Sequence, residues 1–181
     1  MVPLYGTLVF LNVDSPVKES LSKMLLIVGG LTFVVPIFTY YYLKQIGKIT
    51  STNLPHTRER WIPLLINAIL LLILAAVFRH LLYDKLSDWF ILLAIQNSIA
   101  MLLLLVPFKT SIHLFNNMSL ILFLGFLSLE ITTINFIMLS CLWISLIGMA
   151  RLMLKAHRPL ELLIGGNLAI GVHASYFFWF N

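Results

Sequence analysis

The stretch WIPLLINAILLLILAAVF, residues 61–78, decides the fold of this chain, because it carries no charged side chain and is bounded by Arg60 and Arg79. A bilayer core about 30 Å thick is crossed by roughly 20 apolar residues in a helix. We therefore predict a membrane-spanning helix over residues 61–78.

The composition of the whole chain agrees with this prediction. Of its 181 residues, 60% are hydrophobic and only 10% are charged, and the mean hydropathy is +0.98, which is typical of an integral membrane protein. At roughly 20 residues a helix, this length allows about six spans and little else. We predict an all-α integral membrane bundle of six transmembrane helices that forms a single domain over residues 1–181.

Five further apolar stretches supply the remaining predicted spans: residues 24–43, 89–108, 114–129, 135–150 and 160–180. Residues 3–13 are apolar as well, but about 11 residues of helix cover only about 16 Å. We predict a short re-entrant or interfacial segment there. Short polar loops connect the spans: residues 44–60 form the longest one, Asp84, Lys85 and Asp88 lie in another, and a tight turn is expected at Thr132 and Thr133.

Polar side chains inside the predicted spans are expected to form hydrogen bonds between helices. Asn97 and its neighbours lie midway along one span, and His173 lies midway along another. A polar group left unpaired in hydrocarbon costs free energy, and such groups are most often bonded within the bundle. We therefore predict a structural role for these residues.

The segment between the last two spans, ARLMLKAHRPLE at residues 150–161, places a cation, an imidazole and a carboxylate close together. Pro159 lacks a backbone N–H and has a φ angle suited to a first helical turn, so a helix is predicted to begin near it. Glu161 then lies in the first turn, where the helix dipole favours an anion and the carboxylate can reach His157. With Arg151 nearby, this combination is suited to handling phosphate.

Two other loops are predicted to lie on the same side of the membrane as this segment. With six spans, alternate loops share a face, so the first, third and fifth loops meet at one surface. We predict one anion-binding site whose residues are Lys48, Arg58 and Arg60 from the first loop, Ser111 and His113 from the third, and Arg151, His157 and Glu161 from the fifth.

These residues resemble the motifs of the type 2 phosphatidic acid phosphatases, which are relatives of the vanadium haloperoxidases. That family carries Lys-x6-Arg-Pro, Pro-Ser-Gly-His and Ser-Arg-x5-His-x3-Asp. Here the third motif appears as Ala150-Arg151-x5-His157-x3-Glu161 and the second as Thr110-Ser111-Ile112-His113. For the first motif, the cations and the proline are present at another spacing, as Lys48, Arg58-Glu59-Arg60 and Pro63. The resemblance covers roughly residues 44–166. Within the family, the chain is most similar to a compact bacterial branch.

The resemblance implies a membrane phosphatase that hydrolyses a lipid phosphate or diphosphate monoester. His157 would attack phosphorus in line to form a phosphohistidine, while Glu161 holds the other ring nitrogen. His113 would protonate the departing oxygen and later activate water. The phosphate oxygens would be bound by the other site residues, which are Arg151, Arg58, Arg60, Lys48 and Ser111. No metal and no cofactor are implied.

Departures from the family motifs leave a second hypothesis open. Thr110 and Ile112 replace the Pro and Gly of the second motif, and Ala150 replaces a Ser, which removes a hydrogen-bond donor. On this hypothesis the chain is a catalytically impaired family member that acts as a lipid-binding or structural subunit of a membrane protein complex. A transporter fits less well, because neither an inverted repeat nor a chain of intramembrane charges is visible.

The net charge of +5 comes from cations scattered through short loops, which favours membrane lipids or an anionic substrate as partners over nucleic acid. The lone Cys141 excludes an intrachain disulfide, and we expect it to be a small packing residue. The positive-inside rule alone favours a cytoplasmic motif face, but this preference vanishes if Arg58, Arg60 and Arg151 bind phosphate. From the resemblance we expect a multi-pass inner-membrane protein of a bacterium, with its site facing the periplasm.

Overall fold

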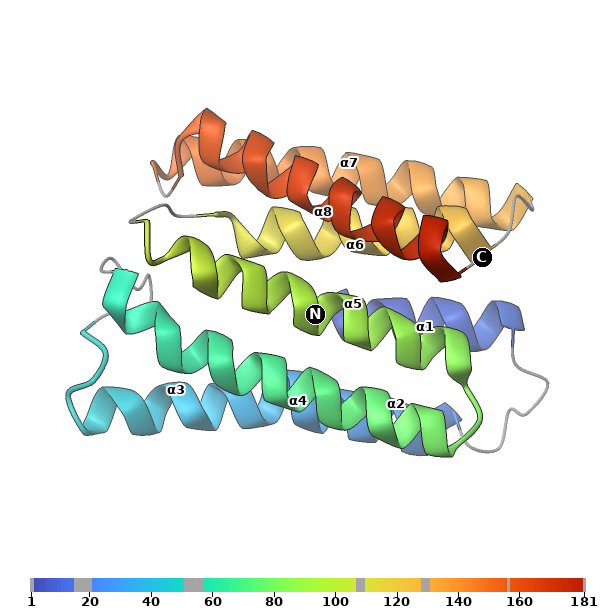
Figure 1. The fold of residues 1–181 in the computed structure, drawn as a ribbon, viewed down its shortest axis with the longest axis horizontal. Helices are drawn as coiled ribbons and strands as arrows, with labels where there is room; N and C mark the ends of the chain where they lie inside the picture. Colours follow the sequence, from blue (N-terminus) through green and yellow to red (C-terminus); the bar gives the residue numbers. More distant parts are fainter. Residues whose placement is uncertain are drawn as a thin grey trace. The chain divides into compact units, whose positions relative to one another are not determined.

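A computed structural model of the protein describes residues 2–14, 21–50, 57–106, 110–127, 131–155 and 157–180. Within these residues the chain is helical and contains no β-strand, which confirms the predicted all-α class. The chain divides into two compact units, Met1–Met101 and Leu102–Asn181 (Figure 1). The single membrane-embedded domain over residues 1–181 stays a prediction.

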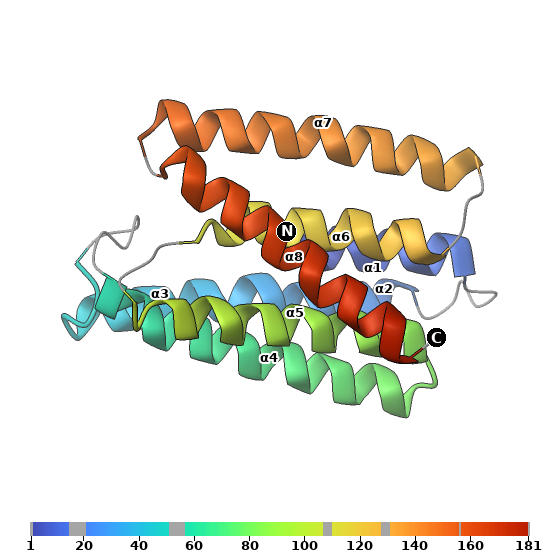
Figure 2. The same ribbon diagram turned by 45° about the horizontal axis from the view of Figure 1, so that its top comes forward.

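The first unit is built from three long helical segments that follow a shorter one, α1 (Val2–Asp14). Helix α2 (Leu21–Gly29), a π-helical turn (Gly30–Val34) and α3 (Val35–Gln45) form one continuous helix. A short 3-10 turn (Thr57–Arg60) leads into α4 (Trp61–His80), and α5 (Asp84–Leu103) follows after a tight turn (Figure 2). The π-helical turn ends two residues before Pro36, whose missing N–H already prevents a regular α-helical hydrogen bond.

Three helices of the described residues are long and apolar enough to cross a membrane: Ser22–Gln45, Arg58–His80 and Asp84–Leu103. They correspond to the spans predicted at residues 24–43, 61–78 and 89–108. Shorter apolar helices cover Val2–Leu11, Ile112–Gly125 and Ile137–Met153. The total of six spans therefore stays a prediction.

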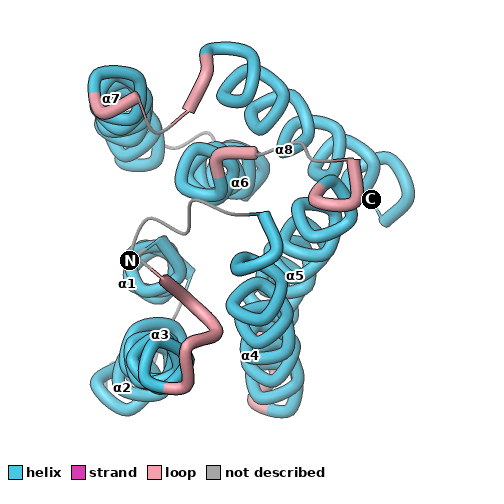
Figure 3. Tube along the Cα trace, turned by 90° about the vertical axis from the view of Figure 1, so that its left-hand side faces the viewer, coloured by secondary structure: helices cyan, strands magenta, loops and turns pink. Residues whose placement is uncertain are grey.

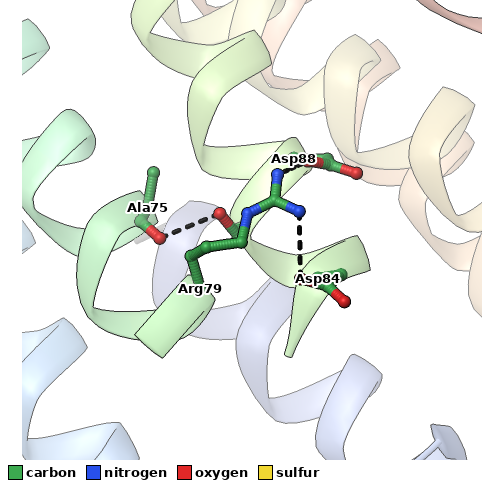
Figure 4. Close-up of polar contacts among 5 residues, drawn as sticks. Ala75, Arg79, Asp84 and Asp88 are labelled. Carbon is green, nitrogen blue, oxygen red and sulfur yellow. Dashed lines mark hydrogen bonds and ion pairs between the residues drawn. The ribbon is translucent and has the colours of Figure 1, made fainter. Parts of the chain in front are cut away.

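The start of α5 differs from the prediction. The sequence suggests a loop at Asp84, Lys85 and Asp88, whereas all three residues lie in the first turns of α5. Arg79, in the last turn of α4, explains the difference, because its Nη1 lies 2.9 Å from Asp84 Oδ1 and its Nη2 lies 2.5 Å from Asp88 Oδ1 (Figure 4). One guanidinium thus compensates both carboxylates, and Asp84 also benefits from the positive end of the helix dipole.

The contact between α4 and α5 combines aromatic rings with a polar bond. The rings of Phe78 and Phe90 stack with their centroids 5.5 Å apart, and both side chains are buried. Farther along the same pair of helices, Asn67 Nδ2 donates to Asn97 Oδ1 over 3.1 Å. This bond confirms that Asn97 connects helices, as predicted.

The second unit consists mainly of α6 (Ile112–Leu127), α7 (Ile131–Met153) and α8 (Pro159–Phe180). Helix α6 packs against both of the others (Figure 3). Helix α8 begins at Pro159 and places Glu161 in its first turn, as predicted. The predicted turn at Thr132 and Thr133 is wrong, because both residues lie in the first turn of α7, where the sequence has no Gly or Pro to interrupt a helix.

Helices α6 and α8 run parallel to each other. A Cβ atom added at Gly165 would lie 3.6 Å from the carbonyl oxygen of Ser111, and eight residues farther along both helices Ser119 Oγ lies 3.0 Å from His173 Nε2. His173 is buried, and its Nδ1 lies 3.0 Å from the carbonyl oxygen of Ala169. Since a carbonyl only accepts, Nδ1 carries the proton and Nε2 accepts from Ser119. His173 is therefore a bonded residue of the helix interface, as predicted.

Helices α6 and α7 run antiparallel. A Cβ atom added at Gly148 would lie 3.9 Å from Leu114, near the start of α6, and one added at Gly125 would lie 4.0 Å from Ile137, near the start of α7. The end of α7 therefore lies beside the start of α6. On α7 the side chain of Cys141 is exposed. Helix α7 contacts its unit mainly through α6, which leaves most of its circumference uncovered.

Candidate functional site

Five of the predicted site residues belong to one end of the second unit. The helix register brings together the start of α6, the end of α7 and the start of α8. The residues found there are Ser111, His113, Arg151, His157 and Glu161. The prediction that the third and fifth loops meet is thus supported by the packing of three helices.

The centre of this site is a contact between His157 and Glu161. Nδ1 of the imidazole lies 2.8 Å from Oε2 of the carboxylate, and the side chains are only 7% and 16% exposed. An ionised carboxylate is only an acceptor, so Nδ1 carries a proton in this contact. In the neutral imidazole the lone pair then belongs to Nε2, which becomes the basic and nucleophilic ring nitrogen.

Glu161 has a second contact that comes from the helix itself. Its Oε2 also accepts from the backbone N–H of Arg158 over 3.3 Å. Arg158 precedes Pro159 at the start of α8, so Glu161 occupies the third helical position, from which a Glu commonly reaches back to the N-cap N–H. The carboxylate therefore caps α8 and orients the imidazole at the same time. These two contacts hold the Glu161 side chain in one position.

The turn before His157 is fixed by backbone geometry. At the end of α7 the N–H of Leu154 donates to the carbonyl of Ala150, and the N–H of Lys155 donates to that of Leu152, both over 3.0 Å. Lys155 has a φ angle of 51°, in the left-handed region that normally favours glycine. Sequence reasoning missed this feature, because a Lys at this position carries no signal for a left-handed turn.

His113 lies in the first turn of α6, just before the span predicted from residue 114. The residue is exposed overall, yet protein atoms exclude water from part of its ring. This desolvation, together with the positive charge of Arg151, lowers the pKa of the His113 imidazole. With its pKa lowered to about 4, His113 is neutral at pH 7.

Ser111 directly precedes α6 and is completely buried. Its hydroxyl Oγ has no hydrogen-bond partner among the described residues, and Thr110 beside it is also buried. Buried hydroxyls are nearly always bonded, so an unpaired one next to a helix N-terminus is an available donor for an anion.

The electrostatics of this end of the unit favour an anion. The N-termini of α6 and α8 both lie here, and each contributes partial positive charge. Arg151 is half-buried in the last turn of α7, and the exposed Lys155 and Arg158 flank the turn that follows. Among the described residues of this end, Glu161 is the one carboxylate, and it is engaged with His157.

The other three predicted site residues lie in the first unit. Lys48 is exposed and follows Gly47, whose φ angle of 69° ends α3; the N–H of Lys48 donates to the carbonyl of Leu43 over 2.9 Å. Arg58 is exposed and Arg60 is half-buried in the short turn before α4. Their meeting with the residues of the second unit stays a prediction.

Comparison of the chain with known protein families, with curated proteins and with solved structures finds no match.

Proposed function

We propose that the protein is a membrane-embedded phosphatase that hydrolyses a phosphate or diphosphate monoester of a lipid through a phosphohistidine. The observation that carries this proposal is the contact of 2.8 Å between His157 Nδ1 and Glu161 Oε2 inside a helix end that is otherwise cationic. An imidazole whose tautomer is set by a carboxylate is an activated nucleophile, and the surrounding positive charge selects an anionic electrophile. The motif resemblance points to the same chemistry.

The proposed reaction has two steps. His157 Nε2 attacks phosphorus, the N–P bond forms, the bond from phosphorus to the lipid oxygen breaks, and His113 gives its proton to that oxygen. Water then attacks phosphorus, gives a proton to His113, and the N–P bond breaks to release inorganic phosphate. Arg151 and the Ser111 hydroxyl bind the phosphate oxygens throughout. Arg58, Arg60 and Lys48 bind the same oxygens if the first loop joins the site.

The lowered pKa of His113 places a condition on its role as an acid. The free protein holds this imidazole neutral because its burial disfavours the charged form and because Arg151 repels a further positive charge. A phosphate dianion placed between these groups reverses the sign of the local field and favours protonation of His113. Substrate binding itself therefore charges the general acid.

The test is release of inorganic phosphate by the purified protein in lipid vesicles or detergent. We expect release from phosphatidic acid or a polyprenyl diphosphate, and loss of that activity by at least about 1,000-fold in His157→Ala. His80→Ala is the matched control, because His80 is an exposed residue in the last turn of α4 and should leave turnover unchanged. Equal inertness of wild type and His157→Ala on these lipids would exclude catalysis.

A second function, binding of a lipid phosphate without turnover, is favoured by the burial of Thr110 and Ser111. With Thr110 4% and Ser111 0% exposed, the loop before α6 has little room to adjust around a reacting group. This function predicts that a lipid phosphate protects the inert protein against heat, and that the protein copurifies with other membrane proteins. Turnover by the isolated chain would count against it.

A further inference from the structure

A buried polar contact joins α6 to α8 at a distance from every residue of the candidate site. Ser119 and His173 are 0% and 1% exposed, and Ser119 Oγ lies 3.0 Å from His173 Nε2. Because His173 Nδ1 donates to the carbonyl oxygen of Ala169 over 3.0 Å, Nε2 is the acceptor and the Ser119 hydroxyl is the donor. The contact is therefore one directed hydrogen bond between two helices.

The same two helices meet the candidate site at Gly165. A Cβ atom added there would lie 3.6 Å from the carbonyl oxygen of Ser111 and 3.7 Å from its amide nitrogen. Gly165 therefore brings the backbone of α8 against the start of α6, where Ser111 and His113 lie. Glu161 is one turn earlier on α8. The spacing between these two parts of the site thus depends on where α8 lies along α6.

The packing around Gly165 holds the register of the two helices only loosely. Gly165 and Ala169 are one helical turn apart, and both residues are small and buried. Small residues at this spacing let two helices approach closely, as they do in membrane bundles. They also form a smooth surface, because neither position carries a large side chain that would oppose a shift of α8 along α6.

The hydrogen bond between Ser119 and His173 has the opposite property, because it forms in one register only. A shift of α8 by one turn moves it about 5.4 Å along α6, which separates the hydroxyl from Nε2 beyond hydrogen-bond distance. In a buried interface this takes the donor away from the imidazole nitrogen, which costs free energy. Buried polar residues fix the register of coiled coils for the same reason.

We propose that Ser119 and His173 are a positioning pair that holds α8 in register with α6 and thereby assembles the anion site at the helix ends. The pair lies eight residues beyond the contact of Ser111 with Gly165, or about 12 Å at 1.5 Å a residue. It acts through the relative position of the two helices and not by touching the substrate. The proposal rests on the anion site of the proposed function, but its tests do not need turnover.

The first experiment measures the register with engineered disulfides in a chain that carries Cys141→Ser. Ser111→Cys with Gly165→Cys joins the helices in the observed register, since the Cβ atom at Gly165 lies against the backbone of Ser111. Ser111→Cys with Ala169→Cys reports a register displaced by one turn. A turn moves a Cα atom about 5.4 Å and a disulfide needs Cα atoms within about 7 Å, so the first pair should form at least about tenfold faster.

Substitutions of the positioning pair should change this ratio of rates. His173→Leu removes the acceptor and keeps an apolar side chain in the interface, so the ratio should fall to about one. His173→Gln retains a side-chain acceptor for Ser119 and should preserve most of the preference. Ser119→Ala is a milder variant that breaks the same bond, and it should act in the direction of His173→Leu.

The second experiment separates positioning from stability. Asn67→Leu is the matched control, because Asn67 Nδ2 donates to Asn97 Oδ1 over 3.1 Å between two helices of the first unit. His173→Leu and Asn67→Leu should each lower Tm by about 3 °C through the loss of one interhelical hydrogen bond. Only His173→Leu should weaken the binding of sulfate, the anion probe, by about tenfold, the effect of about one misplaced charge-assisted hydrogen bond.

Each outcome supports or overturns the positioning role. An unchanged ratio of disulfide rates in both His173→Leu and Ser119→Ala overturns it and leaves the bond a contribution to stability alone. A lost register with unchanged sulfate affinity also overturns it, since the register then does not assemble the site. A wild-type protein that binds no sulfate removes the anion site and the proposal together. If wild type binds sulfate in the observed register but releases no phosphate from lipids, the phosphatase is excluded and the positioning pair is retained.

Discussion

The turn between α4 and α5 and the turn between α7 and α8 have similar plans but different chemistry. In each, a helix ends at a non-glycine residue with positive φ, Leu82 at 62° and Lys155 at 51°, and the next helix carries a carboxylate in its first turn. At the connection between α4 and α5, the carboxylates of Asp84 and Asp88 both bind Arg79. At the connection between α7 and α8, the carboxylate of Glu161 binds the imidazole of His157.

The difference between the partners determines what each turn can do. A guanidinium has only donors and is always charged, so Arg79 held by two carboxylates is a structural clamp. An imidazole has two distinct nitrogens, so the Glu161 contact at Nδ1 concentrates the lone pair at Nε2. The location matters as well, because the Arg79 clamp is exposed whereas His157 is nearly buried beside other cations. The same helix-turn-helix geometry therefore yields a structural pair in one place and a candidate nucleophile in the other.

The largest expected effect is a loss of turnover when the carboxylate that contacts His157 is replaced by an amide. Glu161→Gln keeps the size of the side chain but weakens its hold on the Nδ1 proton, so Nε2 loses basicity and its fixed tautomer. We expect kcat for phosphate release to fall about 100-fold or more, with KM nearly unchanged. The measurement is steady-state turnover of phosphatidic acid.

The control for this substitution is Asp88→Asn, which makes the same change from carboxylate to amide beside the connection between α4 and α5. Its partner Arg79 stays paired with Asp84, so turnover should remain within about twofold of wild type. Equal losses of turnover in the two variants would mean that both act through the fold, and the distinction drawn between the two turns would be lost.

An intermediate effect is expected in the pH dependence of anion binding. Sulfate is a suitable probe because its charge does not change between pH 6 and 8. The pKa of His113 is lowered in the free protein, and a bound dianion raises it, so sulfate binding takes up a proton. By linkage, sulfate affinity should rise as pH falls, by at most about tenfold a pH unit for one proton. Titration calorimetry at pH 6, 7 and 8 measures this slope.

Two variants assign the pH dependence. His113→Gln should flatten the slope, since the residue that gains the proton is gone. Arg79→Gln should leave both the affinity and the slope unchanged, because Arg79 is already paired with two carboxylates. An unchanged slope in His113→Gln would show that another group takes up the proton and would remove His113 from the anion site.

Much of the fold follows from local sequence signals. The apolar stretch at 61–78 and the start of α8 at Pro159 are both found where they are predicted, because hydropathy and the missing N–H of proline act locally. The start of α5 is not predictable in this way. Its charged residues favour a loop when they are considered alone, but Arg79, nine residues before Asp88, compensates them in the structure. Tertiary pairing overrode the local preference for a loop.

The candidate site shows the same division. The spacing of His157 and Glu161 is a sequence signal for one helical turn, and the contact is found at 2.8 Å. The unpaired hydroxyl of Ser111 has no such signal, because it results from the parallel packing of α6 against Gly165 of α8. The left-handed conformation of Lys155 is likewise hidden, since nothing about a lysine indicates positive φ. Features that depend on helix packing or on a strained backbone conformation cannot be predicted from the sequence.

The smallest expected effect concerns that strain. A residue with a Cβ atom in the left-handed region loses about 1 kcal/mol relative to glycine, and glycine returns part of this through the greater entropy of the unfolded chain. Leu82→Gly and Lys155→Gly should therefore each raise Tm by about 2 °C, and Leu82→Ala should not. Leu82 is 85% exposed, so its side chain contributes little packing to lose. The two variants should differ in kcat. Only Lys155→Gly loosens the segment that positions His157, so kcat should fall in that variant alone. A gain in stability without any loss of turnover in both variants would show that the shape of the α7–α8 turn does not limit catalysis.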